Sequence, residues 1–298
     1  MGTGKIIANR DAAPPFSVVP ALFRLMRPKQ WVKNSFVLAP LIFAGQFTNL
    51  PAVSEALLAT LLFSLASSAT YIINDFHDVE HDRNHPLKSK RPLASGQVSK
   101  FQALVLFGAL CGVLVWGYLH RPGVMLVILA YLALNLAYTY ILKYQPVIDI
   151  FSIAIGFILR VHAGAVAVDV PVSAWMFVTT LCLALYLASV KRRQELTQSG
   201  RDGRRVLRQY SVALADRYAE MAATGALLFY SLFVVTVRPE LVVSIPVVLY
   251  GLFRYWFIVE ALEGGESPTD TLLTDWQLFV TVLIWAGLCA WVLWPTGT

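Results

Sequence analysis

The chain has 298 residues, of which 57% are hydrophobic and 14% are charged, and its formal net charge is +6. This composition excludes an ordinary water-soluble domain and indicates a protein that crosses a membrane several times. Cys111, Cys182 and Cys289 lie in apolar segments without the spacing of a metal site, so we expect them to pack as small apolar residues.

The N-terminal segment 1–23 is expected to be mobile, and residues 24–298 are expected to form one transmembrane domain. Apolar runs of about 17 residues or more recur along the chain, and each is long enough to cross a bilayer as a helix. The sequence therefore predicts an all-α polytopic membrane protein with nine transmembrane helices. We place them at 34–50, 52–74, 100–119, 123–141, 147–168, 174–190, 219–237, 241–260 and 277–295.

The basic residues give these spans an orientation. Nearly all of the 24 lysines and arginines fall on one side of the membrane in this topology, chiefly in 1–33 and in two large loops, 75–100 and 191–217. The exceptions are Arg121 and Arg238 on the other side, and Arg160 and Arg254 within spans. The positive-inside rule therefore predicts a multi-pass protein of the cell inner (plasma) membrane with its N-terminus cytoplasmic and its C-terminus outside.

Acidic residues gather where the second span ends. Asn74, Asp78 and Asp82 recur every four residues, which places them on one face of a helix about 6 Å apart along its axis. Mg²⁺ prefers carboxylate, water and phosphate oxygens, so this stripe predicts Mg²⁺ that holds a diphosphate. Two other interpretations are water-solvated charges at a helix end and a zinc site. The zinc ligands would be His77, His81 and His85.

The loop that follows carries the bases that such a site needs. Pro86 and Pro92 favour a non-helical path, which can bring Lys88 and Arg91 back over the acidic helix. Arginine suits bidentate recognition of phosphate, and lysine acts as a point charge. The alternative is that these bases only satisfy the positive-inside rule.

The second cytoplasmic loop begins with Lys191, Arg192 and Glu195 at the end of the sixth span. Glu195 is a candidate ligand of a second Mg²⁺, and Lys191 is a candidate phosphate ligand. The alternative is an ordinary ion pair between residues four apart, worth a few tenths of a kcal/mol.

Two further groups are candidates. Near the N-terminus, bases and a tryptophan precede the first span, where they would either anchor the helix at the lipid surface or contact a lipid phosphate. Those residues are Arg27, Lys29, Trp31, Lys33 and Asn34. Within or beside the spans are Asn135, Tyr138, Lys143, Asp149, Arg160 and His162. Asp149 and Arg160 lie about 16 Å apart on one helix, so each needs a partner from another helix or a bound ligand.

Together these patterns resemble the UbiA superfamily of intramembrane prenyltransferases over nearly the whole chain. The resemblance rests on the acidic stripe, on the His85-Pro86-x-Lys88-x-x-Arg91-Pro92 loop and on the nine spans. It implies a UbiA-like helical bundle with an active site that faces the cytoplasm, Mg²⁺ as cofactor and no nucleic-acid partner.

The finer motifs resemble members of the superfamily that transfer phosphoribose. These motifs are Arg27-Pro28-x-Gln30-Trp31-Val32-Lys33-Asn34, Leu142-Lys143, Leu159-Arg160-x-x-Ala163-Gly164, Lys191-Arg192-x-x-Glu195-Leu196 and Phe253-Arg254-Tyr255. Aromatic prenyltransferases of the superfamily carry a second Asp-rich motif where this chain has Lys191, Arg192 and Glu195. That departure argues against a prenyl diphosphate as the electrophile and suits a donor with an extra phosphate.

The resemblance thus implies Mg²⁺-dependent transfer of 5-phosphoribose from phosphoribosyl diphosphate to a polyprenyl phosphate such as decaprenyl phosphate, with release of diphosphate. Lipid-linked pentose or arabinose for a cell wall is the expected use. The alternatives are prenyl transfer from a polyprenyl diphosphate to an aromatic acceptor, and transport of an anionic lipid. Small residues from Gly108 to Gly112 would allow a homo-oligomer.

The implied roles follow the motifs. The catalytic residues are Asn74, Asp78, Asp82 and Lys191. Ligands of phosphoribosyl diphosphate are Asn74, Lys88, Arg91, Tyr138, Lys143, Arg160, Lys191 and Arg192. Ligands of the lipid phosphate are Arg27, Lys29, Lys33 and Asn34, and metal ligands are Asn74, Asp78, Asp82 and Glu195.

Overall fold

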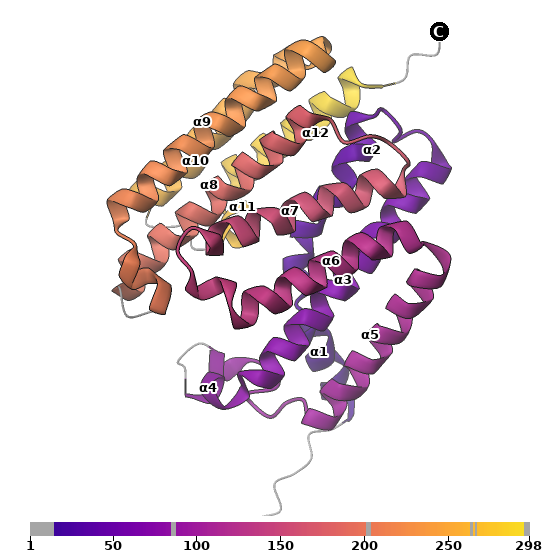
Figure 1. The fold of residues 1–298 in the computed structure, drawn as a ribbon, viewed down its shortest axis with the longest axis vertical. Coiled ribbons are helices and arrows are strands. Elements are labelled where there is room, and N and C mark those ends of the chain that lie inside the picture. The colour runs from indigo at the N-terminus through magenta and orange to yellow at the C-terminus, as the bar shows by residue number, and fades with distance from the viewer. Residues whose placement is uncertain (1–14, 85–87, 201–203, 263–264, 266, 295–298) are drawn as a thin grey trace, which may run out of the picture. The chain divides into compact units, whose positions relative to one another are not determined.

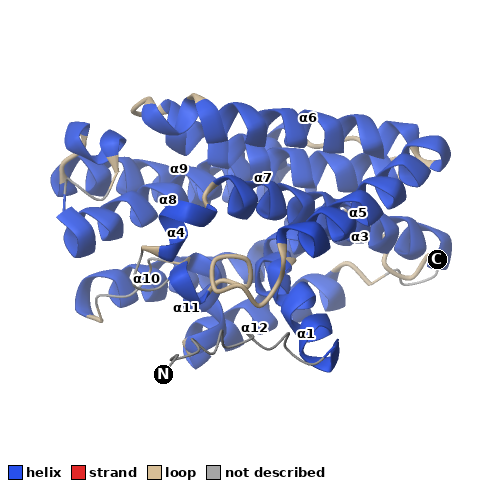
Figure 2. Cartoon of the chain, turned by 90° about the horizontal axis from the view of Figure 1, so that it is seen from below, coloured by secondary structure: helices blue, strands red, loops and turns tan. Residues whose placement is uncertain are grey.

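The structure, a computed structural model, describes residues 15–84, 88–200, 204–262, 265 and 267–294. These residues form helices joined by turns, and the described part contains no strand (Figure 2). Of the segment expected to be mobile, residues 1–14 lie outside the described part and the rest begins the first helix, so mobility stays a prediction.

The all-α prediction is confirmed. The α-helices are α1 (Pro15–Leu25), α2 (Ala39–Phe43), α3 (Leu50–His77), α4 (Val79–Arg83), α5 (Lys100–His120), α6 (Pro122–Tyr140), α7 (Ile148–Ala167), α8 (Ala174–Ser199), α9 (Val212–Val237), α10 (Ile245–Ala261), α11 (Pro268–Thr274) and α12 (Trp276–Val292). Short 3₁₀ helices are η1 (Pro28–Leu38), η2 (Lys88–Lys90), η3 (Leu142–Tyr144), η5 (Arg205–Gln209) and η6 (Pro239–Ser244).

Among the described residues, seven helices are long and apolar enough to cross a membrane. The count rises to eight if α11 and α12, which meet at a 93° bend, form one broken span. A multi-pass membrane protein is therefore supported, whereas the count of nine is not confirmed. The difference arises at the first expected span, 34–50.

That segment does not form one long helix. It is replaced by the 3₁₀ helix η1 and the five-residue α2. A 3₁₀ helix has three residues per turn, so residues three apart share a face. Asn34 and Val37 lie on that face, and both are buried, as is Pro40 of α2. The segment therefore packs one narrow stripe against its neighbours.

The described chain divides into two compact units. The smaller unit comprises 1–28 and 68–112, and the larger unit comprises 29–67 and 113–298. Each unit is described by itself below, and the expectation of one domain over 24–298 stays a prediction.

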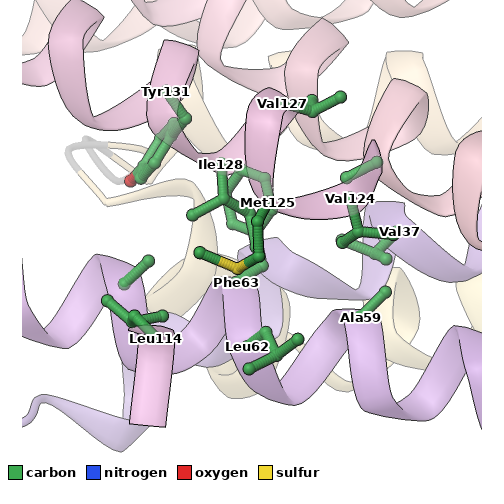
Figure 3. Close-up of a cluster of buried hydrophobic side chains, with 12 residues drawn as sticks. Val37, Ala59, Leu62, Phe63, Leu114, Val124, Met125, Val127, Ile128 and Tyr131 are labelled. Carbon is green, nitrogen blue, oxygen red and sulfur yellow. The ribbon is translucent and has the colours of Figure 1, made fainter. Parts of the chain in front are cut away.

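In the larger unit, α6, α7 and α8 pack in sequence and α9 runs along α8 (Figure 1). One core cluster joins η1, the first part of α3, α6 and α7 through Val37, Phe63, Ile128 and other apolar side chains (Figure 3). Gly164 of α7 makes this packing possible, because a Cβ atom there would lie 1.8 Å from the carbonyl oxygen of Val37.

In the smaller unit, the end of α3 continues into α4 with little interruption. The amide of Asp78 donates to the carbonyl of Asn74 at 2.9 Å, and the amide of Asp82 donates to that of Asp78 at 2.8 Å. The spacing of a helix is thus kept through the break at Asp78. Val79 of α4 and Leu93 and Val98 of the following loop are buried, and α4 packs against η2 of that loop.

Candidate active site

Four charged residues of the smaller unit form a compact cluster, here called the acidic cluster: Asp75, Asp82, Arg27 and Arg91. Arg91 Nη1 lies 3.1 Å from Asp75 Oδ1 and 2.6 Å from Asp82 Oδ2, so it bridges the two carboxylates. Arg27 also pairs with Asp75, and its guanidinium carbon lies 4.9 Å from the centre of the Tyr71 ring. Asp75 is 2% exposed and Asp82 is 1% exposed, so these carboxylates depend on the arginines for charge balance.

One carboxylate oxygen of the acidic cluster remains available as an acceptor or as a metal ligand. Asp82 Oδ1 is buried and has no hydrogen-bond partner among the described residues. Leaving a buried carboxylate oxygen without a partner is costly, and a divalent cation would remove that cost. Mg²⁺ usually takes one or two protein carboxylates and completes its shell with water and phosphate oxygens, so this donor set fits it.

The described residues contain no group of three His, Cys, Asp or Glu side chains arranged to hold a metal ion by themselves. The zinc interpretation therefore gains no support from the described residues. His77 and His81 are exposed, and His85 lies outside the described residues together with Pro86 and Leu87.

The predicted residues of this unit divide between the cluster and its margin. Arg91 returns over the acidic helix as the prolines of its loop suggest. Asn74, Asp78 and Lys88 are half-buried beside the cluster. Arg27, which is expected to bind a lipid phosphate, pairs with Asp75 in this structure. Its φ is 54°, a backbone conformation that is uncommon outside glycine and that accumulates at functional sites.

Sequence reasoning missed Asp75 as a member of the site. The spacing of the acidic residues could have indicated it, because residues seven apart on a helix lie within about 20° of one another around the helix axis. Asp75 and Asp82 have that spacing, and Arg91 bridges this pair.

A second cluster, here called the Arg192 network, lies in the larger unit, where α6, α7 and α8 end or begin. Arg192 is 1% exposed and Asp149 is fully buried, and their Nε and Oδ2 atoms form an ion pair at 2.8 Å. The same guanidinium pairs with Glu195 and donates to the hydroxyl of Tyr138 at 3.2 Å. Asp149 thus has its partner on another helix, as its position in the sequence required.

Tyr210, which no sequence pattern indicated, completes this network. Its hydroxyl donates to Asp149 Oδ1 at 2.8 Å and accepts from the amide of Val147 at 2.8 Å. Burial raises the pKa of the Tyr210 phenol, so the hydroxyl keeps its proton and remains a donor to the carboxylate. Val147 has a φ of 68°, and this contact fixes the turn from which α7 begins.

Besides Tyr138, four predicted residues lie in or near this network, and their surroundings differ. The guanidinium of Arg192 contacts protein groups, namely Asp149, Glu195 and Tyr138. Glu195 is held between Arg192 and Arg204, whose Nη2 lies 3.4 Å from Glu195 Oε1. Lys191 is half-buried on the preceding position of α8, and Lys143 lies in η3 with its Nζ 5.2 Å from the centre of the Tyr144 ring.

The third group surrounds Arg160 in the middle of α7, also in the larger unit. Its Nε donates to Asn34 Oδ1 at 2.9 Å, its Nη1 to the carbonyl of Gly156 at 2.7 Å and its Nη2 to the hydroxyl of Tyr131 at 3.2 Å. Asn34 donates in turn to Ser64 Oγ at 3.0 Å. Asn34 and Arg160, predicted for different substrates, therefore belong to one group.

The remaining candidates lie at the surface of the larger unit. Lys29 is exposed and Lys33 is half-buried on η1.

An apolar hollow of about 320 Å³ lies on α7 and α8, lined by Leu159, Phe177, Thr180 and their neighbours. Such a surface suits a hydrocarbon chain better than a charged ligand.

Comparison with known proteins identifies the family. A model of the UbiA prenyltransferase family matches residues 35–269. The chain is 33% identical to the decaprenyl-phosphate phosphoribosyltransferase of Mycolicibacterium smegmatis, with 94% of each chain covered. It is also 33% identical to the enzyme of that name from Corynebacterium glutamicum, with 95% of this chain and 90% of the relative covered.

A solved structure shares the fold. A UbiA homolog from Archaeoglobus fulgidus, bound to GPP and Mg²⁺, matches 92% of this chain and 99% of its own, with a TM-score of 0.69 and 20% identity. The resemblance expected from the motifs is thereby confirmed. The chain belongs to the UbiA prenyltransferase family and is a multi-pass membrane transferase with the all-helical fold of that family.

Proposed function

We propose that this protein transfers 5-phosphoribose from phosphoribosyl diphosphate to a polyprenyl phosphate of the decaprenyl phosphate type and releases diphosphate. The observation that carries the proposal is the acidic cluster, a buried pair of carboxylates with one unpartnered oxygen and two arginines. Support comes from relatives of nearly equal length whose name specifies this transfer.

Mg²⁺ is the proposed cofactor, held by Asp78 and Asp82 with help from the amide of Asn74. When bound, it would act as a Lewis acid that stabilises the negative charge of the leaving diphosphate. Glu195 is the proposed ligand of a second ion. Because Glu195 already pairs with two arginines, its part in metal binding would require one of those pairs to open.

The bases act on the phosphates of the donor. Arg91 and Lys88 bind diphosphate oxygens, with Lys191, Lys143 and Tyr138 as further donor ligands. Arg192 contributes mainly by fixing Tyr138 and Glu195, because its guanidinium already contacts both and is 1% exposed. Phosphate is recognised by charge-assisted hydrogen bonds of this kind.

The reaction needs no strong general base. The acceptor phosphate is ionised at neutral pH, so its oxygen can attack C1 of the ribose directly. The new C1–O bond forms as the bond from C1 to the diphosphate breaks, and both electrons of the broken bond leave with the diphosphate. Arg27, Lys29, Lys33 and Asn34 remain the proposed ligands of the lipid phosphate, and the lipid tail would occupy an apolar groove between spans.

We also propose that the chain crosses the plasma membrane nine times, with the N-terminus and the active site cytoplasmic and the C-terminus outside. The eleven residues of η1 would extend about 22 Å at 2.0 Å per residue, and α2 adds about 8 Å. This approaches the bilayer core of about 30 Å, so the two together would supply the first crossing. The product would serve as a lipid-linked pentose donor, for example of arabinose for a cell wall.

The test is a radiolabel transfer assay. Purified protein in detergent receives phosphoribosyl diphosphate labelled in the ribose, a polyprenyl phosphate and Mg²⁺, and label is counted in the organic phase. Transfer of label that EDTA abolishes is the expected result. If the protein consumed a polyprenyl diphosphate with an aromatic acceptor and transferred no ribose, the proposal would be wrong and the activity would be ordinary prenyl transfer. Transport of an anionic lipid is refuted by Mg²⁺-dependent turnover in detergent, where no gradient exists.

A further inference from the structure

Arg160 differs from the other arginines of the membrane helices in its partners. Arg192 pairs with Asp149 and Glu195, and Arg254 pairs with Asp275 at 2.6 Å. Arg193 likewise pairs with two carboxylates. No carboxylate of the described residues lies within ion-pair distance of Arg160, although its residue is only 6% exposed.

The surroundings of Arg160 solvate the cation without neutralising it. The aromatic rings of Tyr131, Phe63 and Phe157 lie 4.8, 5.1 and 5.2 Å from its guanidinium carbon. Rings at this range attract a cation through their quadrupole, and the hydrogen-bond acceptors around it are all neutral. The full positive charge of Arg160 is therefore preserved in a buried position, where an anion would be held strongly.

Arg160 also has donors left over. A guanidinium carries five N–H groups, and three of them donate to Asn34, Gly156 and Tyr131. One N–H on Nη1 and one on Nη2 have no partner among the described residues. Two N–H groups on adjacent nitrogens match the two oxygens of a phosphate in the bidentate manner.

The chemistry of the ligand follows from the absence of carboxylates near Arg160. A diphosphate that carries Mg²⁺ needs carboxylate ligands for the metal. Asp78 and Asp82 are the proposed ligands, and the surroundings of Arg160 contain no such group among the described residues. A phosphate monoester needs only cations and hydrogen-bond donors. We propose that Arg160, oriented by Asn34 and Tyr131, binds the phosphate monoester of a substrate. This inference rests on the proposed function. Both the 5-phosphate of the donor and the polyprenyl phosphate have this chemistry.

The decisive variant is Asn34→Asp. It is nearly isosteric, but it places a carboxylate against Arg160 Nε and so gives the cation an internal counterion. We expect Asn34→Asp to weaken binding of the phosphate monoester about tenfold or more, while its thermal stability stays equal to that of the parent or rises. Arg160→Gln should weaken binding at least as much. If Arg160→Gln fails to fold, Asn34→Asp still tests the proposal.

Binding is measured without turnover, on the full chain in detergent with EDTA. Ribose 5-phosphate and a short-chain polyprenyl phosphate are titrated separately by thermal shift, with ribose and a polyprenol as phosphate-free controls. Arg121→Gln serves as the matched variant, because Arg121 lies between α5 and α6 and pairs with Glu55. The expected result is that at least one phosphate monoester binds the parent and Arg121→Gln alike and binds Asn34→Asp about tenfold more weakly.

The two titrations identify which substrate phosphate is bound, and the KM of that substrate should rise in Asn34→Asp and in Arg160→Gln. The proposal is overturned if neither monoester binds the parent, or if Asn34→Asp binds both as the parent does. Failure of the proposed function is distinct, since it would appear as no transfer of label by the parent protein.

Discussion

Gly164→Ala should reveal how closely α7 approaches η1. The added Cβ atom would lie 1.8 Å from the carbonyl oxygen and 2.8 Å from the carbonyl carbon of Val37. Ordinary carbon–oxygen contact begins near 3.3 Å, so the two backbones must separate by about 1.5 Å. Because the obstacle is main chain and not a flexible side chain, relief by a rotamer change is impossible.

The cost follows from this displacement. Overpacking a well-packed core costs about 1–3 kcal/mol, and a clash with main chain belongs at the upper end. A loss of about 3 kcal/mol lowers Tm by on the order of 5–10 °C in a protein of this size. Asn34 lies three residues before Val37 on the same face of η1, so the displacement should also separate Asn34 from Arg160, whose contact is 2.9 Å.

The measurement is the fraction of monodisperse protein left after heating in detergent, together with phosphate binding by thermal shift. Gly287→Ala is the matched control, because it makes the same change in α12, where no atom lies within 4 Å of the added Cβ. We expect that control to remain within about 1 kcal/mol of the parent. If Gly164→Ala proved as stable as Gly287→Ala, the close approach of α7 to η1 would be refuted.

Three further changes test the clusters. Asp82→Asn should abolish label transfer while expression stays near normal. Glu80→Gln, which alters an exposed partner of Arg83, should retain label transfer. Substantial activity of Asp82→Asn at ordinary Mg²⁺ would contradict the metal assignment. Lys191→Ala should raise the KM of the phosphoribosyl donor more than that of the lipid, and an unchanged donor KM would remove Lys191 from phosphate binding. Asp149→Asn should cost about 3 kcal/mol, because Arg192 loses one of its buried counterions; a Tm equal to that of the parent would show that Glu195 alone suffices.

The acidic cluster shows how far local spacing reaches. Helical periodicity predicted that Asn74, Asp78 and Asp82 share one face, and the following loop was predicted to bring Arg91 over the acidic helix, where Arg91 pairs with Asp82. Periodicity did not indicate which of the carboxylates would be buried and paired with arginine. Asp75 became a member because Arg27 and Arg91 both reach it, which depends on how the end of α1 and the loop fold against α3.

The sequence by itself determined the class of the protein, because long apolar runs must form helices to satisfy their backbone in lipid. It also determined the family through motifs whose residues are neighbours in the chain. Only the tertiary structure decided which charges are neutralised. Arg160 and Asn34 are 126 positions apart, and Asp149 and Arg192 meet across two helices. Such pairs depend on the packing of helices around small residues such as Gly164, which periodicity along one helix does not encode.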